Sequence, residues 1–126
     1  MNTKKYIGTK LVEAAPMSAN DAEECGFKTG GKTCDGYWIR YEDGYESWSP
    51  KDVFEKAYKV ADTFKDRLHI EQQDLAEKLS KLCAFVDTPK FEEVVKDEHQ
   101  RDLLLQQRDY MGEYLNILTQ RIKSLE

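Results

Sequence analysis

Cysteine and histidine are scarce in this chain. Its 126 residues include 3 cysteines and 2 histidines, and no two cysteines stand in a CxxC spacing. An odd number of separated thiols disfavours a disulfide framework, and so few thiols and imidazoles disfavour a zinc site. We therefore expect no metal and no cofactor. Cys83 falls on the apolar face of an expected helix, where packing is the ordinary role of a thiol.

Long apolar runs and basic clusters are missing too. No run approaches the ~18 apolar residues of a membrane-spanning helix, and Met1–Lys5 lacks the apolar stretch of a signal peptide. We therefore expect a cytosolic protein without a membrane partner. The net charge of −5 arises from 19 basic and 24 acidic residues, which are spread evenly. This balance argues against a duplex nucleic-acid partner but is compatible with a small anion held by two or three arginines.

Patterns that carry catalysis are also lacking. No Ser-His-Asp or Cys-His spacing occurs, and the carboxylates lie in stretches typical of solvated helix faces. Residues 26–33, GFKTGGKT, satisfy the Walker A pattern. A P-loop, however, needs a hydrophobic strand before it and a helix after it, and the neighbouring residues predict neither. We expect a Gly-rich loop and no enzyme, and an NTPase is the weakest hypothesis.

The first half of the chain carries strand and turn signals. Residues 6–13, YIGTKLVE, predict a strand that ends at Pro16. Ser18 is expected to cap a helical turn that runs through Glu24 and stops at Gly26. Asp43-Gly44 between two aromatic segments, residues 37–41 and 45–48, predicts a tight hairpin.

A short helix is expected to follow the hairpin. Ser49 is its expected N-cap and Pro50 its first residue. The helix should run to about Tyr58 and bury an apolar face. The expected buried residues are Val53, Phe54, Ala57 and Tyr58.

From about Asp62 the pattern predicts helices only. Thr88-Pro89 should end one helix and start another at Pro89, and Asp97 with Gln100 forms an expected capping box for the last helix. In the first of these helices, heptad spacing joins Leu68, Leu75, Leu79, Leu82 and Val86, with Gln72 at a seam position.

The last helix carries two apolar stripes. A heptad seam runs through Leu104, Met111, Leu115, Leu118, Ile122 and Leu125, with Arg108 in one of its slots. Beside it lies a second stripe of Leu103, Tyr110, Tyr114 and Ile117. A helix of roughly 28 residues is about 42 Å long, whereas a compact domain of this size is about 28 Å across. We therefore predict self-association.

These signals define an α+β fold. A small antiparallel β module of about three strands plus a short helix should occupy residues 1–60. A long antiparallel helical hairpin that serves oligomerisation should occupy residues 61–126.

The first half resembles a small N-terminal module of bacteriophage proteins. The resemblance rests on residues 6–12 (YIGTKLV), Pro16-Met17, residues 36–51 and residues 54–58 (FEKAY). The second half is similar to the helical hairpin shared by phage Thoeris anti-defence sponges and phage anti-CBASS sponges. The matching residues there are Leu82, Phe85, Phe91, Gln100, Leu103, Leu104, Gln107, Met111, Tyr114, Leu118, Arg121 and Ile122.

The resemblance implies a non-enzymatic counter-defence protein in the cytoplasm of the infected bacterial host. Such proteins bind cyclic ADP-ribose isomers or cyclic oligonucleotides, sequester them without cleavage, and form homohexamers with pockets between copies. A protein–protein adaptor without a small-molecule ligand is the alternative.

A dinucleotide offers phosphates to guanidinium groups and bases to aromatic faces. The candidate ligand-binding residues are Arg108, Arg101, Arg121, Phe85, Phe91, Tyr110 and Arg40, with Tyr114 as a further stacking residue. For Arg101 and Arg121 the residue pattern favours a structural role. For Arg108, an arginine in a heptad seam, ligand binding and a structural pairing are equally compatible.

Overall fold

The computed structural model describes all residues, 1–126. Contacts within the chain divide it into two compact units, Met1–Lys59 and Val60–Glu126. The first unit contains a three-stranded sheet and two short helices, and the second contains three helices. The fold is therefore α+β, as the sequence predicts.

The sheet of the first unit is antiparallel with the order β1-β2-β3. Its strands are β1 (Glu13–Ser18), β2 (Asp35–Arg40) and β3 (Glu46–Pro50). The prediction of a strand over residues 6–13 was wrong, because β1 begins only at Glu13 and contains Pro16. β1 pairs with β2 alone, and an edge strand tolerates proline because one side of its backbone needs no partner.

The hairpin between β2 and β3 is confirmed. Gly44 has φ +90°, a conformation that glycine adopts without steric cost. The Tyr41 N–H donates to the Tyr45 carbonyl at 2.8 Å, and the Tyr45 N–H donates to Asp43 Oδ1 at 2.9 Å. Asp43 and Gly44 therefore form the turn that their pairing predicts.

One face of the sheet packs on α1 (Ala19–Glu24). Ser18 accepts a hydrogen bond from the Asp21 N–H at 3.2 Å, which confirms the predicted cap. Trp48 clusters with Ala19 and Ala22, and its indole N–H donates to the Met17 carbonyl at 2.8 Å. Gly36 lies under this indole, where an added Cβ would meet the ring at 2.5 Å.

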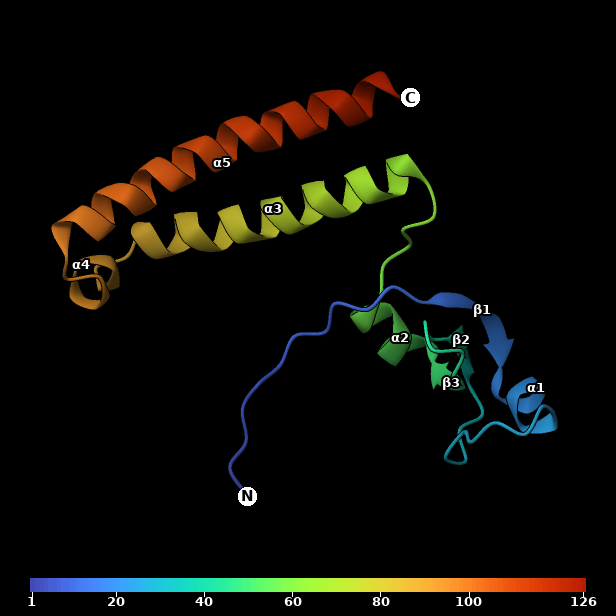
Figure 1. Cartoon of the computed structure of the whole chain (residues 1–126). Helices are drawn as coiled ribbons and strands as arrows, with labels where there is room; N and C mark the ends of the chain where they lie inside the picture. The colour runs from blue at the N-terminus through green and yellow to red at the C-terminus, as the bar shows by residue number, and fades with distance from the viewer. The chain divides into compact units, whose positions relative to one another are not determined.

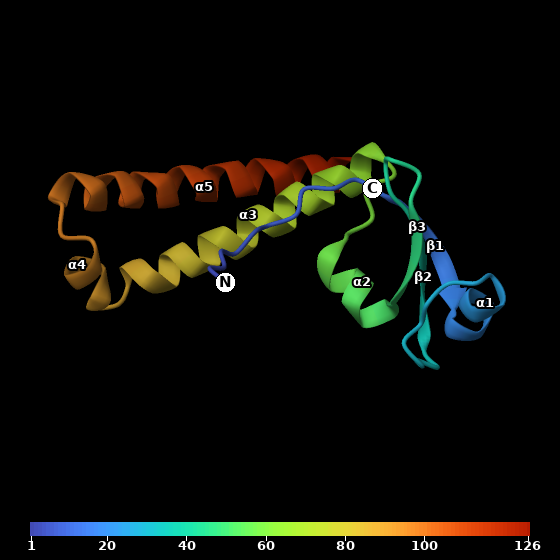
Figure 2. The same ribbon diagram turned by 60° about the horizontal axis from the view of Figure 1, so that its bottom comes forward.

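The opposite face of the sheet carries α2 (Lys51–Ala57). Tyr37 alternates with Gly36 along β2 and so points to the other face, where it stacks on Phe54 at 4.2 Å between ring centroids. Figure 2 shows α1 and α2 on opposite sides of the sheet. The predicted burial of α2 was wrong, because Val53 and Ala57 are exposed and Phe54 and Tyr58 are only half-buried. A single helix at the end of a small sheet has no second layer to cover it.

The start of α2 also differs from the prediction. Ser49 lies within β3, the helix begins at Lys51, and Pro50 precedes it without a side-chain cap. Strand pairing between Ser49 and Tyr37 thus extends further than the capping pattern indicates.

The second unit is a helical hairpin. Helices α3 (Phe64–Val86) and α5 (Glu98–Ser124) lie side by side, with the short α4 (Lys90–Val94) at their turn (Figure 1). Leu68, Leu118 and Ile122 form its buried cluster, and Leu75 packs against them. These are seam residues of the predicted heptads.

The helix ends follow their capping residues. Thr63 and Asp66 form a reciprocal capping box at the start of α3. The Asp97 side chain accepts from the His99 N–H at 3.0 Å, so Asp97 caps α5 as predicted, although the reciprocal bond from Gln100 does not form. Pro89 precedes α4 instead of being its first residue.

Candidate functional site

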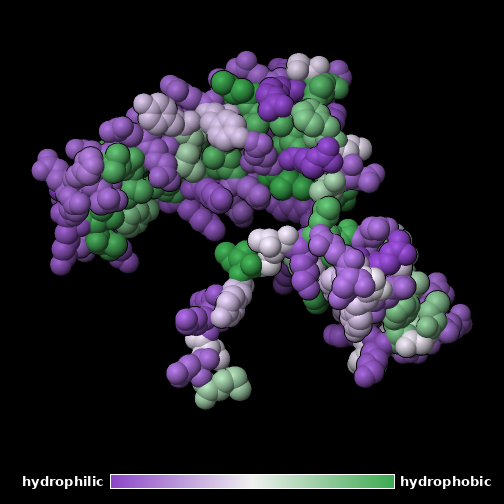
Figure 3. Space-filling model, in the orientation of Figure 1, coloured by the Kyte–Doolittle hydropathy of each residue, from purple (hydrophilic) through white to green (hydrophobic).

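The outer stripe of α5, formed by Leu103, Tyr110, Tyr114 and Ile117, is an uncovered apolar feature of the hairpin. The seam residues Leu118 and Ile122 are buried against α3, whereas Tyr110 is 67% exposed and Ile117 is 55% exposed. Leu103 and Tyr114 on the same stripe are exposed as well. Figure 3 shows hydrophobic surface over the hairpin between hydrophilic side chains. A single copy of the hairpin therefore leaves this stripe in contact with water, as an interaction surface would be.

Arg108 lies in the seam of α5, between the apolar turns of Leu104 and Met111. Its side chain is 34% exposed, and its Nε donates to Asp109 Oδ1 at 3.2 Å. No other hydrogen bond of this guanidinium is formed with the protein. Because a guanidinium carries five N–H donors, Arg108 retains donors for a carboxylate or phosphate.

Arg101 is bonded to two backbone carbonyls of its own unit. Its Nη1 donates to the Val95 carbonyl at 2.8 Å and to the Lys96 carbonyl at 3.0 Å. These bonds join the first turn of α5 to the segment after α4 and satisfy two carbonyls that no helix uses. The sequence favours a structural role over ligand binding for Arg101, and these two backbone carbonyls are its partners within the chain.

Arg121 lies near the other end of α5. Its guanidinium is placed over the Phe64 ring, 5.8 Å from the centroid. Along the axis of α5, Arg108 lies about 10 Å from Arg101 and about 20 Å from Arg121. A single chain thus presents its arginines at separate points.

Phe85 and Phe91 meet at the turn of the hairpin. Their rings form an edge-to-face pair with centroids 5.6 Å apart, and Phe91 is buried. The surface hollow beside Phe91 is also lined by Asp87, Glu92 and Glu93. Three carboxylates and no cation give this hollow a negative potential, which is unfavourable for a phosphate.

The remaining predicted aromatic residue, Tyr110, exposes its ring. Its neighbour on the stripe, Tyr114, donates its hydroxyl to Glu71 Oε1 of α3. Nearby, Gln72 Nε2 donates to Thr119 Oγ1 at 3.0 Å. These two polar pairs across the hairpin, and the contact of Phe64 with Arg121, were not predicted, because they depend on the register between antiparallel helices.

Arg40 belongs to the first unit and lies on β2. Its Nη2 pairs with Glu13 Oε2 at 2.8 Å, and its guanidinium lies 5.3 Å from the Trp38 ring centroid. Both contacts lie on the sheet surface. Arg40 is therefore already engaged with a carboxylate and an aromatic face of its own unit.

The Gly-rich loop of residues 26–33 follows α1 and leads into β2. Gly26, Gly30 and Gly31 have positive φ. No strand feeds the loop and no helix leaves it, so its amides are not aligned with a helix start as in a P-loop.

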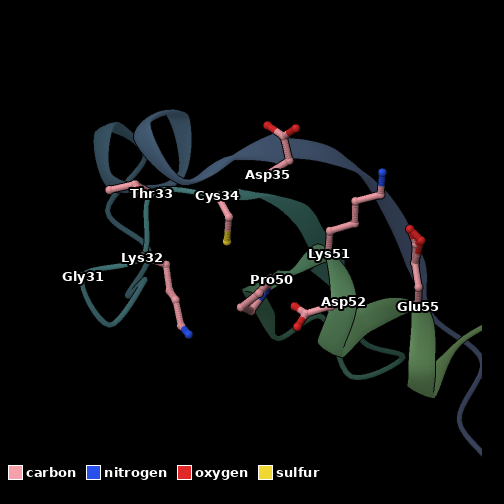
Figure 4. A pocket seen from close by; sticks show the side chains of 9 residues that line it. All are labelled: Gly31, Lys32, Thr33, Cys34, Asp35, Pro50, Lys51, Asp52 and Glu55. Atoms are coloured by element: carbon pink, nitrogen blue, oxygen red, sulfur yellow. The ribbon is translucent and has the colours of Figure 1, made fainter.

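The hollow beside this loop has mixed charge. Figure 4 shows Lys32 and Asp52 extending toward the space between the loop and α2. Lys51, Asp35 and Glu55 also line the hollow. Two cations against three carboxylates do not form an anion site.

Neither a metal-binding cluster nor a membrane-spanning helix is found among the described residues. No group of three His, Cys, Asp or Glu side chains is arranged to hold a metal ion. No helix combines the length and apolar character needed to cross a bilayer.

Comparison with known proteins identifies the second unit. No curated protein and no solved structure matches the chain. The model of one protein family, described as Sequestin, matches residues 62–124. This match begins just before α3 and ends with α5, and it covers half of the chain. The chain therefore belongs to the Sequestin family.

Proposed function

We propose that this chain is a phage counter-defence protein that binds cyclic nucleotide immune signals and sequesters them without cleavage. The observation that carries the proposal is the Sequestin match over the helical hairpin, because the family name describes sequestration, which is binding and not catalysis. The ligands would be cyclic ADP-ribose isomers, cyclic oligonucleotides or both. The site of action would be the cytoplasm of the infected bacterial host.

The binding site would form between copies of the chain. The exposed stripe of Leu103, Tyr110, Tyr114 and Ile117 supports self-association, since burying it in a partner removes apolar surface from water. On one α5, Arg121 lies about 20 Å along the axis from Arg108, and Arg101 is bonded to the Val95 and Lys96 carbonyls. Convergence of free guanidinium groups would therefore draw on more than one copy. A homohexamer with pockets between copies would meet this need.

Arg108 is the residue of this site that the contacts support best. Its Asp109 partner leaves guanidinium donors for two phosphate oxygens, which a planar fork binds bidentately. Tyr110 lies two residues further along α5 with its ring exposed and would stack on a base. Arg121, Phe85, Phe91, Arg101 and Arg40 stay as predicted contributors, although Arg101 and Arg40 would have to share their present partners.

Sequestration acts by mass action and requires no covalent step. To compete with an immune receptor, the affinity would be nanomolar or tighter, about −12 kcal/mol. A pocket assembled before the ligand arrives loses less side-chain entropy on binding. Assembly of copies would therefore precede tight binding.

Ligand depletion tests the proposal directly. The protein is incubated with cyclic ADP-ribose isomers and with cyclic di- and trinucleotides, the mixture is filtered, and the retained protein is heated. Recovery of intact nucleotide after heating is the expected result. A turned-over product would indicate an enzyme. Absence of depletion would favour the alternative, a protein–protein adaptor, which could also use the exposed stripe of α5 to bind its partner.

Substitution of Arg108 tests the site. Arg108→Ala should abolish binding in calorimetry while light scattering shows the same assembly. Arg108→Lys keeps the positive charge but loses the planar guanidinium that can bind two oxygens at once. We expect its affinity to lie between the affinity of the native protein and that of Arg108→Ala. Lys123→Ala, which removes a charge from the last turn of the same helix, is the matched control. Unchanged affinity in Arg108→Ala would remove Arg108 from the site.

A further inference from the structure

The N-terminal segment of residues 6–12 has the composition of a strand but no strand partner. It has no regular structure in the chain, and Tyr6 and Ile7 are 88% and 94% exposed. In Figure 1 the chain before β1 is extended and leads away from the sheet. β-branched and aromatic residues favour a strand only when a neighbouring strand supplies the hydrogen bonds. The segment therefore lacks a ladder.

The free edge of β3 offers such a ladder. The Tyr41 N–H bonds to the Tyr45 carbonyl, and hydrogen-bonded pairs alternate along an antiparallel ladder. Ser47 and Ser49 therefore point their backbone groups at β2. Glu46 and Trp48 point theirs outward, and β3 has no partner on that side. Unpaired edges of this kind accept an added strand.

The segment cannot pair along its whole length with this edge within its own chain. Residue 12 is followed directly by β1, which lies on the other side of β2. The two edge strands are about 9.5 Å apart, and no residue remains between the segment and β1 to cross that distance. Lys10, which lies 4.8 Å from the Tyr41 ring centroid, holds the end of the segment at the hairpin by a cation–π contact.

Charge favours pairing between copies. Residues 1–12 contain Lys4, Lys5 and Lys10 and no acidic residue. The end of β3 at the hairpin is acidic, with Glu46 in the strand and Glu42 and Asp43 in the turn. Opposite charges steer a strand to the edge and oppose like-charged partners.

We propose that residues 6–12 of one copy add to the outer edge of β3 of a second copy as a fourth strand. This interface lies in the first unit, outside the residues of the Sequestin match, and does not rest on ligand binding. It joins copies through backbone hydrogen bonds, whereas the α5 stripe would join them through side chains.

Photo-crosslinking tests this pairing in the full chain. p-Benzoylphenylalanine replaces Tyr6, and equal amounts of ¹⁴N and ¹⁵N protein are unfolded together and refolded. Crosslinked peptides that join the heavy N-terminal segment to light residues 46–50, and the reverse, are expected. Crosslinks to β3 within one copy, crosslinks confined to α3–α5, or no crosslinks would each overturn the proposal.

Proline substitution provides a second arm. Ile7→Pro with Gly8→Pro removes two adjacent N–H groups, one of which faces the partner in any register. The segment has no regular structure to disrupt, so the fold should be unchanged. We expect a fall of about tenfold in crosslink yield, the effect of one lost backbone hydrogen bond. Asn2→Pro, outside the segment, should retain the yield, and equal yields in both variants would contradict strand addition.

Discussion

Leu118→Ala should destabilise the helical hairpin more than any change on its outer face. Leu118 is 0% exposed and packs on Leu68 and Ile122. The substitution removes three carbon atoms, which at about 0.8 kcal/mol each is worth about 2.4 kcal/mol. The cavity adds to this cost, so we expect a loss of about 3 kcal/mol in the free energy of unfolding. That loss lowers the folding equilibrium constant about 150-fold.

Urea unfolding followed by two signals measures this effect. Far-UV circular dichroism reports mainly the long helices α3 and α5, whereas tryptophan fluorescence reports Trp38 and Trp48, which both lie in the first unit. Leu118→Ala should shift the dichroism transition to lower urea and leave the fluorescence transition in place. Equal shifts of both signals would refute the assignment of Leu118 to a core of its own.

Ile117→Ala, at the residue just before Leu118, is the matched control. Ile117 is more than half exposed, and a surface truncation changes stability by about 0.5 kcal/mol or less. If copies bury the stripe, the cost should grow with protein concentration, because association stabilises by mass action. A cost equal to that of Leu118→Ala in dilute protein would show that the outer face is already covered within one chain.

Three further predictions concern single positions. Gly36→Ala places a Cβ 2.3 Å from the Ser49 carbonyl oxygen, so the fluorescence-monitored stability should fall by about 1–3 kcal/mol; no loss would show that β3 can move. Gly112→Ala meets nothing within 4 Å, so the hairpin should gain about 0.5–1 kcal/mol in urea unfolding, and a loss would indicate a close partner. The Thr63 backbone N–H holds the pKa of the Asp66 carboxyl below its ordinary value. The ionised carboxyl therefore stabilises the fold at pH above the ordinary pKa, and this contribution is lost as the pH falls through the lowered pKa. NMR titration should find the lowered pKa, and an ordinary pKa would exclude the capping box in solution.

Local signals in the sequence predicted the elements whose formation depends only on residues close to them in the sequence. Asp43-Gly44 predicted the hairpin because a glycine with positive φ suffices to reverse the chain. The heptad spacing placed Leu68 and Leu118 in the apolar seams of their helices, and both are buried where the two helices meet. The strand over residues 6–13 was mispredicted because strand propensity has no effect without a pairing edge.

The site was less predictable than the fold. Heptad spacing placed Arg108 in the seam, where it lies. The pairing of Arg101 with carbonyls after α4 and the contact of Arg121 with Phe64 depend on how turns bring distant residues together. Helical periodicity carries no information about those distances, so the partners of both arginines could not be read from spacing.

The boundary between the two units falls in a short segment without helix or strand. α2 ends at Ala57 and α3 begins at Phe64, and the Sequestin match begins at residue 62. A genetic crossover in the codons for residues 58–61 would interrupt no helix and no strand. An exchange of the sheet module at this junction would leave the strands of the sheet and the helices of the hairpin uncut, so the junction is the place to graft a different module.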